Sequence, residues 1–202
     1  MSAPDRSRPE NALAVAERPR SLVRLMARKD KADPLAAAIR AAFGLDLPPP
    51  GRWSAGAEAC ATWVQPGGWL LESEPSAPGA LRARVAAATG GLGAAVDQSS
   101  GASVIRLAGA PARSVLATVC RLDLHPRAFG PDSAAMTRIA HVVCGIRLAD
   151  ATPSFDLIVA STYARWLIEE LLEASARYGV RFEPAPKPKP YRSAMPDSGP
   201  MR

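Results

Sequence analysis

The order in which helices and strands are predicted to follow one another constrains the fold of this chain more than any other feature. A strand near residues 21–27 precedes a helix ending at Phe43, a hairpin within 61–71, a second helix ending before Gly90, and a strand at 94–96. This order, β-α-β-β-α-β, is that of the split βαβ or ferredoxin-like motif.

The second half of the chain predicts the same order, with the last strand as a possible addition. The elements are strands at 103–107, 141–148 and 155–159, a helix after Pro111, a helix at about 161–178 and a short strand at 180–182. In the final helix, apolar residues recur at spacings of 4, 3 and 4, namely Leu167, Leu171, Ala174 and Tyr178. That spacing is helical. We therefore expect an α+β fold made of two fused ferredoxin-like (βαββαβ) units.

Proline and glycine mark the ends of the predicted elements. Asp33-Pro34 is typical of a helix start and Gly44 of a helix end. Pro66-Gly67-Gly68 indicates the hairpin turn, and Pro78-Gly79 opens the second helix. The residues between these marks supply the predicted helices and strands.

The two ends of the chain differ in composition from the middle. Residues 1–19 are polar with little periodicity, and residues 183–202 contain six prolines. Proline removes a backbone donor and favours extended chain. We therefore expect a flexible N-terminal segment over 1–19, one folded domain over 20–182 and a Pro/Lys-rich tail over 183–202, with 1–18 and 185–202 dispensable for folding.

The distribution of charge argues against a nucleic-acid-binding protein. The net charge is +6, but residues 32–180 hold 12 basic and 13 acidic residues. The basic excess therefore lies in the two ends, whereas a nucleic-acid module carries a basic face on its folded body.

The sequence also predicts a cytoplasmic protein without a membrane segment. No apolar run approaches the ~18 residues that a membrane helix needs, and the first ten residues lack the apolar stretch of a secretory signal. Only three cysteines occur, an odd and low number that favours a reducing compartment.

Candidate acid–base residues are few. His125 lies in a predicted polar loop, where we expect it to fix a turn before Pro126 rather than to act as a base. His141 is expected to open a strand as a half-buried structural residue. Asp97 is the best candidate for a catalytic carboxylate, but its position beside Ser99 favours a turn-capping role.

Metal and nucleotide sites are not indicated. Cys60, Cys120 and Cys144 lack the paired spacing of a zinc site. The segment 90–93 (Gly-Gly-Leu-Gly) lacks the frame of a dinucleotide-binding loop, and Pro111 removes a donor from the turn at 109–111. We assign no catalytic, cofactor-binding or metal-binding residue to the chain.

Tryptophan is over-represented among the aromatic residues, with four of eleven. We expect each of Trp53, Trp63, Trp69 and Trp166 to fill a core. For Trp166, which flanks the apolar stripe of the last helix, contact with a partner protein is the sharper hypothesis, because tryptophan is enriched at interfaces.

Several motifs together resemble one known family. They are Asp97-Gln98-Ser99, residues 106–109 (Arg-Leu-Ala-Gly), residues 122–129 (Leu-Asp-Leu-His-Pro-Arg-Ala-Phe), residues 136–140 (Met-Thr-Arg-Ile-Ala), residues 155–159 (Phe-Asp-Leu-Ile-Val) and residues 163–167 (Tyr-Ala-Arg-Trp-Leu). The middle pieces, with Thr137-Arg138, are the most specific. Over residues 20–182 the chain resembles the gamma subunits of heterotetrameric sarcosine oxidases.

The resemblance implies a non-catalytic structural subunit with a fold related to the folate-binding glycine-cleavage T-protein group. The implied complex oxidises sarcosine to glycine, with hydrogen peroxide and a one-carbon unit passed to tetrahydrofolate as the other products. It implies partners, the alpha, beta and delta subunits, of which alpha is the most direct. FAD, FMN and NAD are implied on alpha and beta, tetrahydrofolate on alpha and zinc on delta, with no cofactor and no activity on this chain alone.

Two alternatives stay open. One is the equivalent subunit of N-methylglutamate dehydrogenase, which one chain cannot separate from sarcosine oxidase because the substrate site lies on another subunit. The other is a stand-alone folate-binding one-carbon protein, with Asp97 as its acidic group. The family often has Gly-Pro where this chain has Gly109-Ala110-Pro111, and the Lys-Gly-Cys segment of tRNA-modifying relatives is absent.

Overall fold

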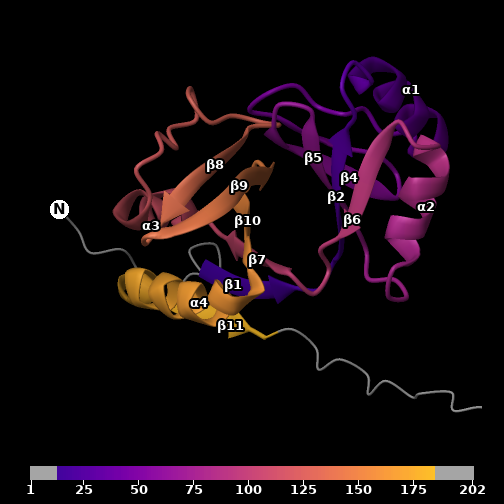
Figure 1. The fold of residues 1–202 in the computed structure, drawn as a ribbon. Coiled ribbons are helices and arrows are strands. Elements are labelled where there is room, and N and C mark those ends of the chain that lie inside the picture. Colours follow the sequence, from indigo (N-terminus) through magenta and orange to yellow (C-terminus); the bar gives the residue numbers. More distant parts are fainter. Residues whose placement is uncertain (1–12, 185–202) are drawn as a thin grey trace, which may run out of the picture.

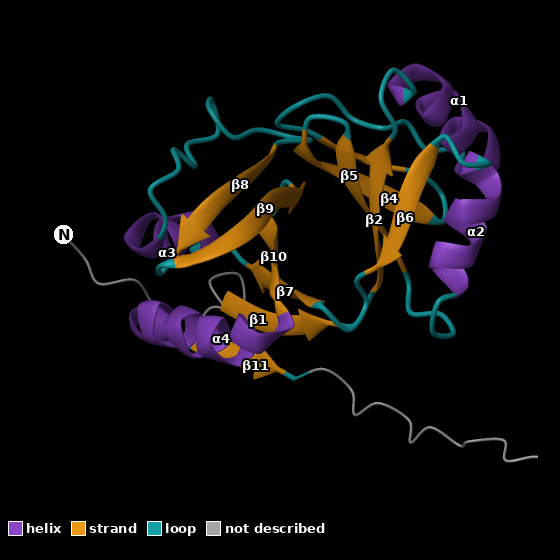
Figure 2. Ribbon diagram, in the orientation of Figure 1, coloured by secondary structure: helices purple, strands orange, loops and turns teal. Residues whose placement is uncertain are grey.

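The computed structural model describes residues 13–184, which form two facing β-sheets with helices on their outer sides (Figure 1). The first sheet is covered by α1 (Ala32–Phe43) and α2 (Ala80–Thr89), and the second by α3 (Ala112–Val119) and α4 (Ser161–Ser175). Figure 2 shows this helix–sheet–sheet–helix arrangement by element type. No helix within these residues is both long enough and apolar enough to cross a membrane.

The first sheet confirms the ferredoxin-like prediction for the first half. Its strands are β2 (Ser21–Ala27), β3 (Trp53–Ala55), β4 (Ala59–Gln65), β5 (Gly68–Ser73) and β6 (Gly93–Asp97). They lie in the order β3-β4-β5-β2-β6, and every neighbouring pair is antiparallel. The four strands β4-β5-β2-β6 have the split βαβ order, and β3 is an extra edge strand.

The second sheet has the same plan, but one of its strands comes from the other end of the chain. Its strands are β1 (Leu13–Arg18), β7 (Ala102–Ala108), β8 (Ala134–Ile139), β9 (Val142–Asp150), β10 (Ser154–Ala160) and β11 (Val180–Glu183). Their order is β11-β1-β7-β10-β9-β8. β1 pairs antiparallel with β7, in the place where a last strand would close the motif, and β11 pairs parallel with β1 outside it.

The expectation of a flexible segment over residues 1–19 is therefore wrong for residues 13–18. Leu13 and Val15 are fully buried in the second core, because β1 lies inside the sheet and its alternate side chains face the helices. Residues 1–12 and 185–202 lie outside the described part of the chain, as does most of the predicted tail over 183–202; Glu183 itself ends β11.

The helices begin and end close to the predicted positions. The backbone of Gly44 is left-handed after α1 and that of Gly90 is left-handed after α2, and each donates to a carbonyl of the last helical turn. Such caps are the reason that glycine marks helix ends. The last helix ends with a 3-10 turn, Ala176–Tyr178.

Each sheet has its own core on the helix side. Val23, Leu25 and Leu71 of the first sheet pack against α1 and α2, and the larger second core joins β1, β7, β9 and β10 to α3 and α4. The opposite faces of the two sheets meet each other. There, Leu22 and Leu70 of the first sheet pack against Val104 of the second in a small dry cluster.

Candidate functional site: a buried charge network between the sheets

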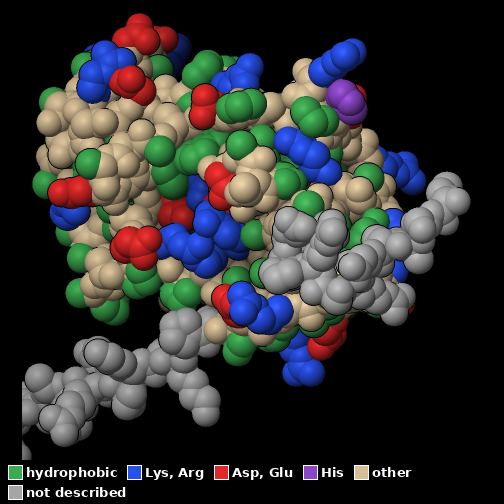
Figure 3. All heavy atoms as spheres, turned by 180° about the vertical axis from the view of Figure 1, so that it is seen from behind, with side chains coloured by type: hydrophobic (Ala, Val, Ile, Leu, Met, Phe, Trp, Pro, Cys, Tyr) green, Lys and Arg blue, Asp and Glu red, His purple; other side chains and the backbone are tan. Residues whose placement is uncertain are grey.

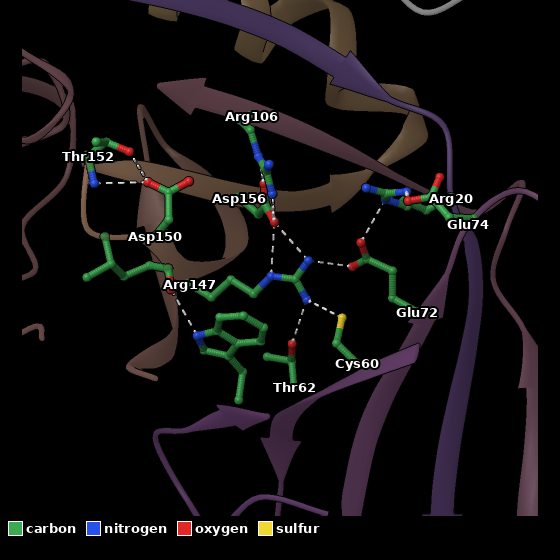
Figure 4. Close-up of polar contacts among 12 residues, drawn as sticks. Arg20, Cys60, Thr62, Glu72, Glu74, Arg106, Arg147, Asp150, Thr152 and Asp156 are labelled. Atoms are coloured by element: carbon green, nitrogen blue, oxygen red, sulfur yellow. Dashed lines mark hydrogen bonds and ion pairs between the residues drawn. The ribbon is translucent and has the colours of Figure 1, made fainter. Parts of the chain in front are cut away.

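Charged side chains meet beside that cluster, where the two sheets face each other (Figure 4). Arg147, Asp156 and Arg106 lie next to one another on β9, β10 and β7, because the strand register pairs Arg147 with Asp156 and Asp156 with Arg106. Glu72 on β5 and Cys60 on β4 are paired in the same way on the first sheet. Since side chains alternate along a strand, all five point into the space between the sheets while their neighbours enter the two cores.

Arg147 is the centre of the network. Its Nε and Nη2 donate to Oδ2 of Asp156 at 3.1 and 2.8 Å, and Nη2 also donates to Oε2 of Glu72 at 2.8 Å. Its Nη1 donates to Sγ of Cys60 at 3.0 Å and to Oγ1 of Thr62 at 3.3 Å. One guanidinium therefore joins two strands of the first sheet to two of the second.

Two further arginines complete the ion pairs. Arg106 holds Asp156 in a bidentate pair, with Nε to Oδ1 at 2.7 Å and Nη2 to Oδ2 at 2.9 Å. Arg20 pairs with Oε1 of Glu72 at 3.0 Å and also with Glu74. Three arginines thus face three carboxylates, and the charges of the network cancel.

Trp53 closes one side of the network. Its ring lies 5.0 Å from the Arg147 guanidinium carbon, a cation–π distance, and its indole Nε1 donates to the Leu148 carbonyl at 3.0 Å. The side chain of Trp53 comes from the first sheet and both partners come from β9. Trp53 therefore connects the two halves in addition to the hydrogen bonds of Arg147.

The centre of the network is almost completely buried, and this shifts the pKa values of its members. Arg147, Glu72 and Asp156 are 3%, 4% and 1% exposed. Burial opposes the charged form of Asp156, but hydrogen bonds from Arg106 and the charges of Arg147 and Arg106 outweigh it and lower its pKa. Burial raises the pKa of the Cys60 thiol to about 11, although Arg147 opposes this.

These groups are not suited to acid–base or nucleophilic chemistry at neutral pH. A general acid or base works best with a pKa near the operating pH, and a cysteine nucleophile must be a thiolate. The pKa of Asp156 is lowered and that of Cys60 is raised, so each is held away from neutrality. The arrangement is instead suited to holding two sheets in one register.

The cavities at this place are modest. A cleft of about 230 Å³ reaches the network and is lined by Arg20, Arg106 and the turn between β3 and β4. Figure 3 shows basic side chains gathered near the boundary of the two halves on the face behind that of Figure 1. A second cavity of about 490 Å³ also borders Trp53, and its lining includes three prolines together with the charged residues Arg113, Asp132 and Asp150.

The two histidines lie away from the network. His125 is exposed in the loop after α3; its Nδ1 accepts from the Arg127 amide at 3.2 Å and its own amide donates to Asp123 at 2.9 Å. Its predicted turn-fixing role is confirmed. The prediction for His141 is wrong, because it lies exposed in the tight turn between β8 and β9 with φ of 80°, not half-buried in a strand.

Asp97 has the turn-capping role predicted from its neighbours. Its Oδ1 accepts from the Ser99 amide at 2.8 Å at the end of β6. The backbone and side-chain hydrogen bonds of Ser99 lower the pKa of this carboxyl. Asp97 is therefore ionised at neutral pH and bound within its own turn.

The cysteines and tryptophans are distributed through the structure. Cys120 and Cys144 are buried in the second core, and no group of three His, Cys, Asp or Glu among residues 13–184 could hold a metal ion. Trp69 is buried, as predicted, and Trp63 and Trp166 are half-buried against the first and second cores. A partner contact of Trp166 stays a prediction.

Arg147, Glu72 and Asp156 were not predicted from the sequence to form a site. A signal was present, since each is a charged residue within or directly after an apolar strand, at a position that alternates with core residues. Lone charges at such positions are rarely buried unless they are paired. The sequence could not predict that these three side chains meet, because Glu72 and Arg147 are 75 residues apart in the chain.

Comparison with known proteins finds relatives over most of the chain. Residues 28–177 match the model of the sarcosine oxidase, gamma subunit family. The chain is 39% identical to sarcosine oxidase subunit gamma of Arthrobacter sp. over 108 residues, which span 52% of this chain and 53% of that protein. It is 31% identical to the Corynebacterium sp. (strain U-96) subunit gamma over 69% of this chain and 70% of that protein.

Solved structures agree with the sequence relatives. A chain of heterotetrameric sarcosine oxidase from Corynebacterium sp. U-96 superposes with a TM-score of 0.75 at 26% identity, over 86% of this chain and 89% of that one. The glycine cleavage system aminomethyltransferase T of Bartonella henselae shares the fold, with a TM-score of 0.62 at 16% identity over 85% of this chain and 47% of that one. The predicted T-protein-like fold is confirmed, and the chain belongs to the sarcosine oxidase gamma subunit family.

Proposed function

We propose that this chain is a structural, non-catalytic subunit of a heterotetrameric sarcosine oxidase. The observation that carries the proposal is the superposition with a chain of such an enzyme over nearly the whole length of both chains. The candidate site supports it, because its carboxylates are neutralised by arginines and its thiol is held protonated.

The chemistry then belongs to other subunits. By family resemblance we assign FAD, FMN and NAD to the alpha and beta subunits, tetrahydrofolate to alpha and zinc to delta, with alpha as the direct neighbour of this chain. We further propose a cytoplasmic complex in which residues 13–183 form the folded body of this subunit, and in which this chain has no activity alone.

Purification of the complex under gentle conditions tests the proposal. The full chain, tagged in its native cell, should co-purify with three other subunits in equal amounts, and the complex should be yellow and oxidise sarcosine with release of hydrogen peroxide. Oxidation of N-methylglutamate in place of sarcosine would assign the chain to the related dehydrogenase. Isolation of the chain as a colourless monomer with no partner would contradict the proposal.

A stand-alone folate-binding function receives no support from Asp97, whose carboxylate is bound in a turn at the end of β6. Equilibrium titration of the isolated chain with tetrahydrofolate separates the two possibilities. We expect no saturable binding at micromolar concentrations. Stoichiometric binding would favour the stand-alone function.

A further inference from the structure

The space between the two sheets has three zones along the strands. The charge network fills one end, and the dry cluster of Leu22, Leu70 and Val104 fills the middle. We call the third zone the open end; it is lined by Val96 on the first sheet and by Met136 and Val143 on the second, and Val64 and Ile158 lie where it borders the dry cluster. The sheets do not bury one another there.

Apolar side chains at the open end are in contact with water on both sheets. Val96 is 44% exposed, Met136 46% and Val143 55%. Ala95 packs into the first core and Cys144 into the second, so their neighbours Val96 and Val143 point the opposite way, into the space between the sheets. Three of the five large exposed apolar residues within 13–184 thus lie on two surfaces that face each other.

The charges at the open end have one sign. Arg24 and Arg138 point into it from β2 and β8, and no Asp or Glu does so from the strands that line it. Arg24 donates to the amide oxygen of Gln65 at 2.8 Å, and neither arginine has an ion pair with any residue between 13 and 184. The surface is therefore apolar with two basic groups.

We propose that the open end receives a segment of a neighbouring subunit that carries apolar side chains flanked by carboxylates. The proposal rests on the proposed function, because the segment belongs to another subunit of the same oxidase. Exposed apolar patches of this kind mark interaction sites, and two arginines that have no ion pair among residues 13–184 favour an acidic partner. A second copy of this chain fits poorly, since it would bring the same recessed surface and the same positive charges.

The test is the affinity of the purified full chain for the remaining oxidase subunits, measured with single glutamate substitutions. Val143→Glu and Val96→Glu place a carboxylate on either side of the open end and should each weaken assembly by at least about tenfold, as expected at the centre of an interface. Arg138→Glu should also weaken assembly, and the complex of this variant should depend less on salt concentration than the wild type does.

Ala86→Glu is the matched control. Ala86 is exposed on α2, on the outer side of the first sheet and outside the space between the sheets, so its substitution should leave the affinity unchanged. The melting temperature of each isolated variant should stay within a few degrees of the wild type, since exposed positions are changed. A bulky photo-cross-linker at position 143 should join this chain to a partner subunit.

Each of the following outcomes would overturn the proposal and would show why it fails. Wild-type affinity in all three glutamate variants would place the interface elsewhere and leave the proposed function intact. A concentration-dependent dimer of the isolated chain that Val143→Glu abolishes would identify a second copy as the occupant. Tighter assembly after deletion of 185–202 would identify the chain's own tail. Failure of the wild type to assemble would remove the proposed function as well.

Discussion

Every nitrogen of the Arg147 guanidinium has a hydrogen-bond partner, and the partners come from both sheets. A buried ion network of this kind contributes little net stability compared with a well-packed apolar core, because desolvation of the charges offsets their attraction. What it provides is a requirement for one register: any shift of one sheet along the other leaves a buried charge without its partner.

Arg147→Met should therefore destabilise the protein strongly. The substitution removes the positive charge that lies between the Glu72 and Asp156 carboxylates. Loss of one member of a buried ion pair costs about 3–5 kcal/mol. Urea unfolding of the purified chain measures the change. As a control, Arg165→Ala removes an exposed pair with Glu169 and should change stability by about 0.5 kcal/mol or less. Equal effects of the two substitutions would refute the role given to Arg147.

The decrease in the free energy of unfolding at acid pH should depend on Asp156. Its pKa is lowered in the folded state, so its ionisation adds stability above the unfolded value of about 4, and this contribution is lost as the pH falls from there through the folded pKa. The free energy of unfolding, measured between pH 2 and pH 6, should decline below about pH 4. Asp156→Asn should flatten that decline, and an unchanged slope in the variant would contradict the assignment.

Among the elements, those with local signals were predicted and those with only distant partners were not. The four helices follow from proline and glycine at their ends and from apolar residues at helical spacing. β1 has just two core positions, Leu13 and Val15, and its partners β7 and β11 lie about 90 and 170 residues further along the chain. β8 was not predicted for a similar reason. Apolar and polar residues alternate only weakly within Ala134–Ile139, and the segment is a strand because it pairs with β9.

Removal of β1 should abolish folding of the second half, contrary to the expectation from composition. Deletion of residues 1–18 takes away an interior strand, whereas deletion of residues 1–12 leaves β1 in place. The shorter deletion should keep a cooperative melting transition and the longer one should lose it, as followed by near-ultraviolet circular dichroism.

Within β1, the single substitution Leu13→Ala should cost about 2–5 kcal/mol, the range for a fully buried leucine. A stable, cooperative protein lacking residues 1–18 would show that β1 is dispensable.

At the scale of the whole molecule, the two halves are connected at several places. β1 and β2 belong to different sheets although only Pro19 and Arg20 separate them, the dry cluster and the charge network join the facing strands, and Trp53 contacts β9. The sequence could predict two similar units, because each repeats the same local pattern. It could not predict that they interlock, because that depends on contacts between residues far apart in the chain.

We therefore expect both halves to unfold in one transition. A variant that keeps Trp53 and Trp69 reports on the first core by fluorescence, and one that keeps Trp53 and Trp166 reports on the second, so both retain the contact of Trp53 with β9. Their urea midpoints should coincide with each other and with the far-ultraviolet circular dichroism of the same variants. Two separate midpoints would show that the halves are independent.

The position of β1 also has a consequence for synthesis on the ribosome. The strand leaves the exit tunnel well before its partner β7, which is made about 90 residues later, or roughly 5–20 s at ordinary rates of translation. During that delay Leu13, Val15 and an unpaired strand edge are exposed in the nascent chain. The first sheet can form meanwhile, but the second must wait until β7 and the strands that follow it have been made. We expect slower elongation to lengthen this exposure and lower the yield of soluble subunit, and early chaperone binding to raise the yield.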